Sequence, residues 1–259
     1  MAAENGLVMA LWQGESVAGD ADHAFTRIAQ ATGAAGMAGA DVITFPELMT
    51  SGYNRDDLTD HAMTMAELAG RLAPIARDAG CAIVTGYPER LDHGVANAAI
   101  CVAADGTVLA NHRKIQLFGP DEARKFRPGD AYTSFMLCGR RAAMLICYDV
   151  EFAPHVAALK GQGVEMILVP TANMHPFAHI GQHVIPAMAA NHALSIVYAN
   201  YCGAEGDLSY FGGSSITSAD GHVLARAGDA PCLLISHLPA HPDPATLSTQ
   251  LRDLRQIAG

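Results

Sequence analysis

Short apolar segments recur along the whole chain, and glycine, proline, aspartate or asparagine bounds each of them. Segments of this length with these boundaries are typical of buried β-strands. The pattern predicts nine strands, which begin near Leu7, Asp41, Cys81, Ala98, Arg141, Met166, Leu194, Gly212 and Cys232.

Alanine-rich segments with helical spacing lie between these strands, over residues 21–38, 63–79, 152–162 and 181–193. The last segment contains Pro186, which should end or kink a helix. The tail, residues 244–257, is predicted to form a final helix. Because no linker, repeat or low-complexity segment interrupts the pattern, we expect one domain over residues 1–259.

The order of the elements predicts an α/β fold. Strands and helices alternate at both ends of the chain, and the strands are too continuously apolar for a sheet with one wet face. Stacked sheets covered by helices satisfy both observations. The strands before Glu47, Cys147 and Thr171 each end in polar residues. Sites in open α/β sheets form beyond the carboxyl ends of strands, so these three ends mark a candidate site.

Composition narrows the class of protein. Half of the residues are hydrophobic and 16% are charged, a low share that suits an oligomer or thick buried layers. The net charge is −10 and no long Lys/Arg run occurs, which argues against nucleic-acid binding. No stretch of about 18 apolar residues predicts a membrane span. The N-terminus lacks the basic region of a signal peptide. We therefore expect a soluble cytoplasmic protein.

Cysteine usage favours reduced thiols. The six cysteines are widely spaced without a CxxC pair, so neither a zinc cluster nor a disulfide framework is predicted. Most buried cysteines are inert, and Cys101 and Cys232 lie in apolar strands. Cys147, in the stretch MLICYDVE, differs because it ends a strand and is followed by Tyr148, Asp149 and Glu151. It is either structural or a nucleophile.

A nucleophilic thiol needs a base or a nearby cation. His175, His179 and His183 crowd one region without an HExxH motif, which leaves a metal site as a minor alternative to a solvent-facing histidine cluster. Glu47 could act as a base or simply begin a helix. Lys114, after another strand, could be an ordinary surface lysine.

Three segments in the same order resolve these alternatives when they are read together. They are FPELMTSGY around Glu47, HRKIQLFGPDEARKFRPGD around Lys114 and LICYDVEF around Cys147. With ILVPTANM, YANYCGAEG and GGSSITSADG further along, the chain from about residue 7 to 238 resembles the nitrilase superfamily of carbon–nitrogen hydrolases.

The resemblance implies a four-layer α-β-β-α sandwich and a Glu47–Lys114–Cys147 triad, with Glu122 as a second glutamate. It implies a homodimer or larger homo-oligomer and no metal or organic cofactor. Lys114 would favour the thiolate, and Glu47 would carry protons. Lys114 and the backbone N–H of Tyr148 would stabilise the oxyanion, and Glu122 would orient Lys114 or the substrate amide.

The substrate follows from finer resemblance. Nitrile-cleaving relatives typically have Cys-Trp-Glu and longer chains, whereas Cys-Tyr-Asp stands here. SGYN, GYPER, VPTANM and YANYCGAE look similar to bacterial aliphatic amidases of the 5-aminopentanamidase type. We therefore expect hydrolysis of a small primary amide, with Tyr53, Asn173 and Met174 in the pocket or, for Tyr53 and Met174, in the core. The alternatives are a nitrilase, an N-carbamoyl amide hydrolase, or a catalytically idle ligand-binding member.

The chain departs from these relatives after the nucleophile. Ala157, Pro186 and Met188 stand where relatives carry arginine. The pair Asn191-His192 stands where relatives carry Glu-Asn. Their joint change suggests the loss of structural ion pairs. We expect consequences for substrate specificity and subunit-interface geometry more than for the chemistry.

Overall fold

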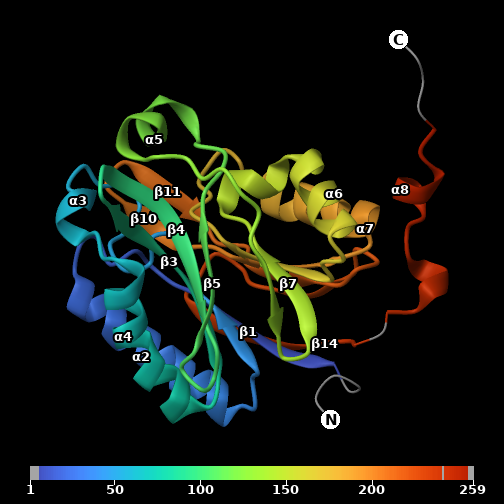
Figure 1. Cartoon of the computed structure of the whole chain (residues 1–259), viewed down its shortest axis with the longest axis horizontal. Helices are drawn as coiled ribbons and strands as arrows, with labels where there is room; N and C mark the ends of the chain where they lie inside the picture. The colour runs from blue at the N-terminus through green and yellow to red at the C-terminus, as the bar shows by residue number, and fades with distance from the viewer. Residues whose placement is uncertain (1–5, 241, 256–259) are drawn as a thin grey trace.

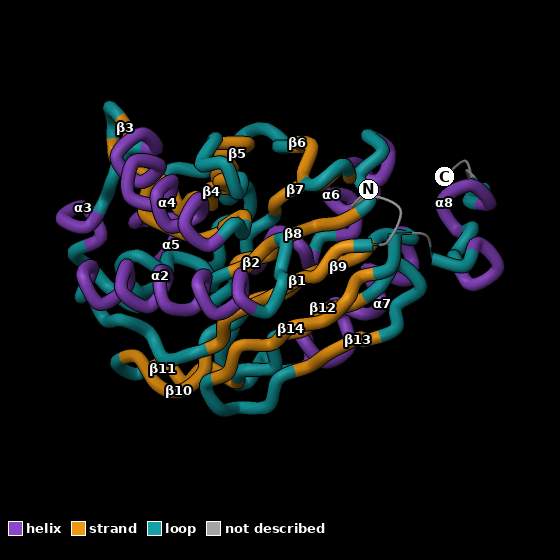
Figure 2. The backbone as a smooth tube through the Cα atoms, turned by 90° about the horizontal axis from the view of Figure 1, so that it is seen from below, coloured by secondary structure: helices purple, strands orange, loops and turns teal. Residues whose placement is uncertain are grey.

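Two six-stranded sheets pack face to face in the computed structural model, and helices cover both outer faces (Figures 1 and 2). The structure describes residues 6–240 and 242–255. Three apolar clusters separate the four layers, and one of them lies between the sheets. The predicted α-β-β-α sandwich is therefore confirmed.

The first sheet has the order β14-β1-β2-β3-β4-β5. Its central strands β1, β2 and β3 are parallel, and the pairings of β14, β4 and β5 are antiparallel. Two antiparallel pairings separate β5 from β3, so β5 points the same way as β2 and β3. The strands are β1 (Leu7–Gln13), β2 (Val42–Thr44), β3 (Ala82–Leu91), β4 (Gly94–Val102), β5 (Val108–Arg113) and β14 (Cys232–Leu238).

The second sheet has the order β13-β12-β9-β8-β7-β6, with β7, β8 and β9 parallel. A separate hairpin, β10 (Cys202–Glu205) and β11 (Leu208–Phe211), lies between β9 and β12 in the sequence. The sheet strands are β6 (Ser134–Leu137), β7 (Arg140–Met144), β8 (Met166–Pro170), β9 (Ser195–Ala199), β12 (Ser215–Thr217) and β13 (Val223–Arg226).

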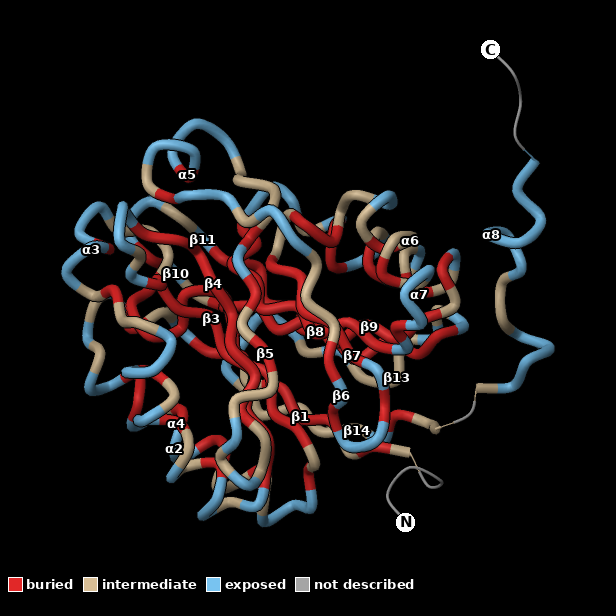
Figure 3. The backbone as a smooth tube through the Cα atoms, in the orientation of Figure 1, coloured by how far each residue is buried: buried red, intermediate tan, exposed pale blue. Residues whose placement is uncertain are grey.

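The continuous apolar runs reflect burial of both faces of these strands (Figure 3). In β1, Met9 and Leu11 enter the core between the sheets, whereas Ala10 packs with the helices α2 (Ala21–Met37) and α4 (Met65–Ala79). Helices α6 (Ala153–Gly161) and α7 (Ile185–His192) cover the second sheet.

Local sequence signals set several helix boundaries. Thr64 and Glu67 form a reciprocal capping box at the start of α4, and Gly80 ends it in the left-handed conformation at φ 61°. Pro186 occupies the first turn of α7, where a missing N–H is tolerated. The predicted interruption is a π-helical segment, η2 (Ile180–Val184), that runs directly into α7.

The prediction of one C-terminal helix over residues 244–257 is wrong for the described part of the tail. A 3₁₀ turn, η3 (Pro244–Thr246), and the four-residue α8 (Gln250–Asp253) stand there, and residues 256 and 257 lie outside the described residues. The tail is largely exposed, so it lacks the apolar contacts that stabilise a short helix. No described helix is long and apolar enough to cross a membrane.

Candidate active site

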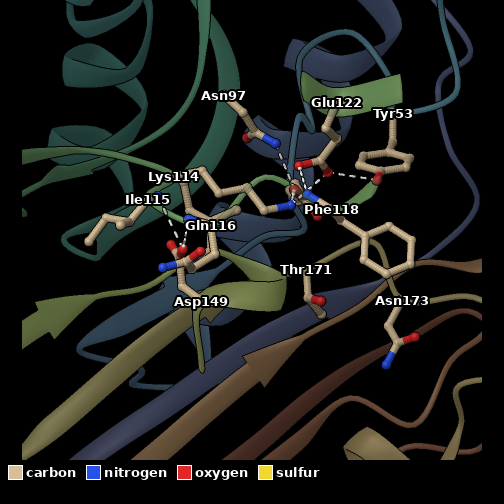
Figure 4. A network of polar contacts seen from close by, with 12 residues as sticks. Tyr53, Asn97, Lys114, Ile115, Gln116, Phe118, Glu122, Asp149, Thr171 and Asn173 are labelled. Atoms are coloured by element: carbon tan, nitrogen blue, oxygen red, sulfur yellow. Dashed lines mark hydrogen bonds and ion pairs between the residues drawn. The ribbon is translucent and has the colours of Figure 1, made fainter. Parts of the chain in front are cut away.

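The polar strand ends meet at one edge of the two sheets. Glu47 follows β2, Lys114 follows β5, and Cys147 follows β7 after two buried residues. The backbone N–H of Glu47 donates to the carbonyl of Thr171, the residue after β8, at 3.3 Å. The carboxyl ends of the parallel strands thus bring together segments that are far apart in sequence (Figure 4).

Lys114 lies between two carboxylates. Its Nζ is 2.7 Å from Oε1 of Glu47 and 2.7 Å from Oε1 of Glu122, and all three side chains are buried. Burial favours the neutral amine, but the two carboxylates outweigh it and raise the pKa of Lys114 well above its usual value. Lys114 is therefore a fixed ammonium rather than a surface lysine.

Glu47 has one occupied and one open oxygen. Oε1 accepts from Lys114 and from Nδ2 of Asn97, each at 2.7 Å, whereas Oε2 is buried without a hydrogen-bond partner in the described part of the chain. Burial raises the pKa of Glu47, Lys114 opposes the rise, and the Glu122 charge adds to it. The open oxygen is a proton acceptor in a carboxylate of raised basicity.

Glu122 is held by three donors. It lies on α5 (Gly119–Lys125), where Oε1 accepts from Lys114 and from the hydroxyl of Tyr53 at 2.7 Å, and Oε2 accepts the N–H of Phe118 at 2.8 Å. The backbone N–H of Tyr53 donates in turn to buried Glu205 at 3.2 Å. Because these three hydrogen bonds hold the carboxylate of Glu122 in place, it fixes the position of the Lys114 ammonium.

Cys147 begins a 3₁₀ helix, η1 (Cys147–Glu151), in the left-handed conformation at φ 46°. That conformation costs a non-glycine residue about 1–2 kcal/mol, and such strain concentrates at functional sites. Burial, followed by the Glu47 charge, raises the pKa of the thiol, and Lys114 lowers it without compensating. The expected lysine effect is present, yet the resting group is a thiol, so attack requires a base.

Asp149 joins the two segments that carry the lysine and the cysteine. Its Oδ1 accepts the N–H groups of Ile115 at 3.1 Å and Gln116 at 2.6 Å, immediately after the lysine. Its Oδ2 accepts from the N–H of Ile146 at 3.1 Å, immediately before the cysteine, and lies 3.4 Å from Nε2 of buried His112. From the sequence, Asp149 stood out only as a polar residue after the cysteine and as part of the Cys-Tyr-Asp pattern. The available signal for its role was that an Asp side chain can accept hydrogen bonds from nearby backbone N–H groups.

A cavity of about 290 Å³ opens over the cysteine. It is small beside typical ligand pockets of about 300–1,000 Å³. The three residues expected in the pocket all line it, together with Glu151, which the sequence marked only as a polar residue after the cysteine. The lining is Tyr53, Phe118, Cys147, Tyr148, Glu151, Asn173, Met174, Phe177, His179 and Ile180.

Tyr148 and Asn173 are two further residues of the pocket, and the first contributes its backbone whereas the second is fixed by hydrogen bonds. Tyr148 lies in the first turn of η1, where backbone N–H groups lack intrahelical acceptors. Asn173 donates its N–H to Oδ1 of Asn200 at 2.8 Å, and its Nδ2 lies 3.1 Å from the hydroxyl of Tyr198. Sequence reasoning missed Asn97 and Asn200, because nothing local distinguishes a buried asparagine that serves a site.

The positions that depart from the family pattern lie away from this cavity. Ala157 is on α6, and Pro186, Met188 and Asn191 are on α7; none of the four lines the cavity. Asn191 accepts a hydrogen bond from Gln250 of the tail at 3.1 Å. Their expected effect on substrate specificity would therefore have to act at a distance from the pocket.

No group of three or more His, Cys, Asp or Glu side chains within residues 6–240 and 242–255 is arranged to hold a metal ion. Of the three clustered histidines, His179 lines the cavity and the other two do not. The polar side chains that line the cavity with the cysteine are Tyr53, Tyr148, Glu151, Asn173 and His179.

Comparison with known proteins gives consistent matches. Residues 8–240 match the family described as carbon-nitrogen hydrolase. A "hydrolase in pqqF 5'region" of Pseudomonas protegens is 41% identical over 204 residues, 77% of this chain and 72% of that protein. An (R)-stereoselective amidase of Pseudomonas sp. is 33% identical over 73% of this chain and 69% of its own. An amidase structure from Nesterenkonia sp. has a TM-score of 0.88 at 32% identity, covering 97% of this chain and 94% of that one.

Proposed function

This protein belongs to the carbon–nitrogen hydrolase family and is an amidase, and we propose that it converts a small aliphatic primary amide to carboxylate and ammonia through a thioester on Cys147. One observation carries the proposal. A buried ammonium, Lys114, is fixed between two glutamates and lowers the pKa of the Cys147 thiol. One of these glutamates, Glu47, keeps an oxygen that has no hydrogen-bond partner among the described residues.

Acylation follows from this arrangement. As Sγ of Cys147 attacks the amide carbon, Oε2 of Glu47 takes the thiol proton, and the carbonyl oxygen becomes an oxyanion. The Lys114 ammonium and the N–H of Tyr148 donate to it, and one such donor is typically worth about 3 kcal/mol. Glu47 then returns the proton to the leaving nitrogen, the C–N bond breaks, and ammonia departs.

Deacylation reverses the roles. Water gives a proton to Glu47 and its oxygen attacks the thioester carbon; the C–S bond breaks, and the proton returns to Cys147. The raised pKa of Glu47 makes it a better base than an ordinary carboxylate. Glu122 keeps Lys114 charged and in place throughout, and the steps as written use only side chains, backbone N–H groups and water.

The small cavity and one set of relatives support small aliphatic amides. Variants of the amidase from Nesterenkonia sp. AN1 are described in complex with butyramide and with acrylamide added to the active site cysteine by Michael addition. A cavity of about 290 Å³ has room for acyl groups of that size.

Ammonia release from matched amide, nitrile and N-carbamoyl substrates tests the reaction, with mass spectrometry of the trapped protein for an acyl group on Cys147. Cys147→Ala should abolish turnover with the fold intact. Cys138→Ala, at an exposed turn, is the matched control and should retain it. Full amide turnover by Cys147→Ala would refute the mechanism, and faster nitrile or carbamoyl cleavage would refute the substrate class.

A further inference from the structure

Glu205 is a buried carboxylate that the reaction leaves unused. It ends β10, in the hairpin outside the two six-stranded sheets, and the residue is 4% exposed. Its Oε1 is buried without a hydrogen-bond partner in the described part of the chain. A buried charge costs free energy that an apolar side chain of similar size avoids. Stability alone therefore does not explain a carboxylate at this place.

The other oxygen of Glu205 holds a segment that follows Glu47. Oε2 accepts the backbone N–H of Tyr53 at 3.2 Å and the hydroxyl of Tyr210 at 2.6 Å. Oε1 lies so close to Gly52, at φ 87°, that an added Cβ would be 2.3 Å from it. Burial, followed by the charge of Glu205, raises the pKa of Tyr210, so this hydroxyl keeps its proton and stays a donor. The carboxylate is thus fixed against the backbone of residues 52 and 53.

The same hairpin also supports a second wall of the cavity. Tyr210 pairs with Met174 in an isolated antiparallel bridge, and the N–H of His175 donates to the carbonyl of Ser209 at 2.9 Å. Met174 and Tyr53 both line the cavity. The hairpin therefore connects two walls that come from distant parts of the sequence.

Tyr53 links this support to the lysine. Its N–H is held by Glu205, whereas its hydroxyl donates to Oε1 of Glu122 at 2.7 Å. The same oxygen accepts from Lys114 at 2.7 Å (Figure 4). The two ends of one tyrosine thus span the distance from the hairpin to the ammonium. Misplacing a reacting group by about 1 Å can reduce a rate about 100-fold, so the position of Tyr53 matters for the rate.

We infer that Glu205 is a positioning residue for the amidase reaction and that it acts by holding Tyr53. With Tyr53 in place, its hydroxyl meets Glu122, which keeps Lys114 directed at the developing oxyanion. The inference rests on the proposed reaction and adds a residue of the hairpin to it. A purely structural carboxylate would stabilise the hairpin without any dependence on the tyrosine hydroxyl.

A double-mutant cycle in kcat on the best amide separates the two roles. Glu205→Leu removes the acceptor of the Tyr53 N–H and should lower kcat about tenfold, the loss also expected for Tyr53→Phe. In the Tyr53→Phe background the same leucine should lower kcat less than twofold, because no hydroxyl is left to position. Glu205→Gln keeps an acceptor and should stay within threefold of the wild type. An equal loss in both backgrounds, or a glutamine variant as slow as the leucine variant, would overturn the inference.

Asp41→Leu is the matched control for lost stability. The carboxylate of Asp41 also accepts a backbone N–H, from Val8 at 2.8 Å, but it precedes β2, whereas Glu47 follows the other end of that strand. This variant should have a lower free energy of unfolding and a kcat within threefold of the wild type. A loss of kcat equal to that of Glu205→Leu would assign both losses to stability and would overturn the inference. If Glu205→Leu does not fold, Glu205→Asp, one methylene shorter, replaces it with the same expected outcomes.

Alkylation of Cys147 distinguishes failure of this inference from failure of the amidase proposal. Because Lys114 lowers the pKa of the Cys147 thiol, a displaced Lys114 should move its reaction with iodoacetamide to higher pH. Peptide mass spectrometry follows Cys147 itself, and Glu205→Leu should shift its rate profile in the wild type but not further in Tyr53→Phe. If the wild type hydrolyses no amide, the amidase proposal fails and this profile still decides the role of Glu205. An unchanged profile in Glu205→Leu would overturn the inference.

Discussion

Replacing Asp149 by asparagine should weaken the connection between the segment that follows Lys114 and the residue that precedes Cys147. In the native site, Oδ1 accepts the N–H groups of Ile115 and Gln116, and Oδ2 accepts that of Ile146. Asparagine can keep the first two bonds through its oxygen. Its amide nitrogen then faces the N–H of Ile146, so two donors meet in a buried site.

The size of the effect follows from these three bonds. A hydrogen bond to a charged group contributes about 1.5–3 kcal/mol, and a buried N–H left without an acceptor costs about 1–3 kcal/mol. One lost bond and one orphaned donor together predict about 2.5–6 kcal/mol of destabilisation for Asp149→Asn. Catalysis should suffer as well, because misplacing a reacting group by about 1 Å can reduce the rate about 100-fold.

Two measurements check the prediction for Asp149→Asn, the free energy of unfolding by denaturant and kcat with KM on the best amide. The loss should lie mainly in kcat, because the substrate cavity does not include Asp149. Asp105→Asn is the control, since that carboxylate accepts one backbone N–H, from Thr107 at 2.8 Å, in an exposed turn. A change in the free energy of unfolding below about 1 kcal/mol, with kcat within threefold of the wild type, would refute the idea that Asp149 holds the Lys114 and Cys147 segments together.

Three further substitutions test other parts of the site. Gly86→Ala should lower activity and should also lower the free energy of unfolding by about 1–3 kcal/mol or more. The new Cβ would lie 2.3 Å from the backbone N of Leu48 and would displace the segment that carries Glu47. A normal kcat and a normal free energy of unfolding would contradict this. Tyr53→Phe should lower kcat about tenfold by removing one donor to Glu122, with unfolding as the control; an unchanged kcat would show that the hydroxyl is dispensable. Glu151→Gln should have a higher free energy of unfolding than the wild type above pH 7, by about 1 kcal/mol after allowance for the solvent exposure of the side chain. The reason is that the raised pKa of Glu151 destabilises the folded wild type as the pH rises from about 4.5 to about 7. Denaturation at pH 4 and pH 8 measures the difference, which should vanish at pH 4.

Much of the fold could be read from local patterns. The apolar strand at Leu7 and the capped helix that ends at Gly80 depend on neighbours in sequence, so periodicity and capping identify them. The tail after Pro244 could not be read in the same way. A helix of that length depends on tertiary contacts, and the largely exposed tail makes few of them.

The sequence by itself determined the layered α/β class and marked Glu47, Lys114 and Cys147 as polar residues at strand ends. Only the tertiary structure decided how they interact. Strand pairing brings Asn97 to the glutamate from 50 residues away, and burial, which no local pattern encodes, keeps the cysteine a thiol. The same folding places Glu151 in the lining of the cavity, where no other described residue pairs with it, because side-chain direction and solvent access depend on packing between segments that are distant in sequence.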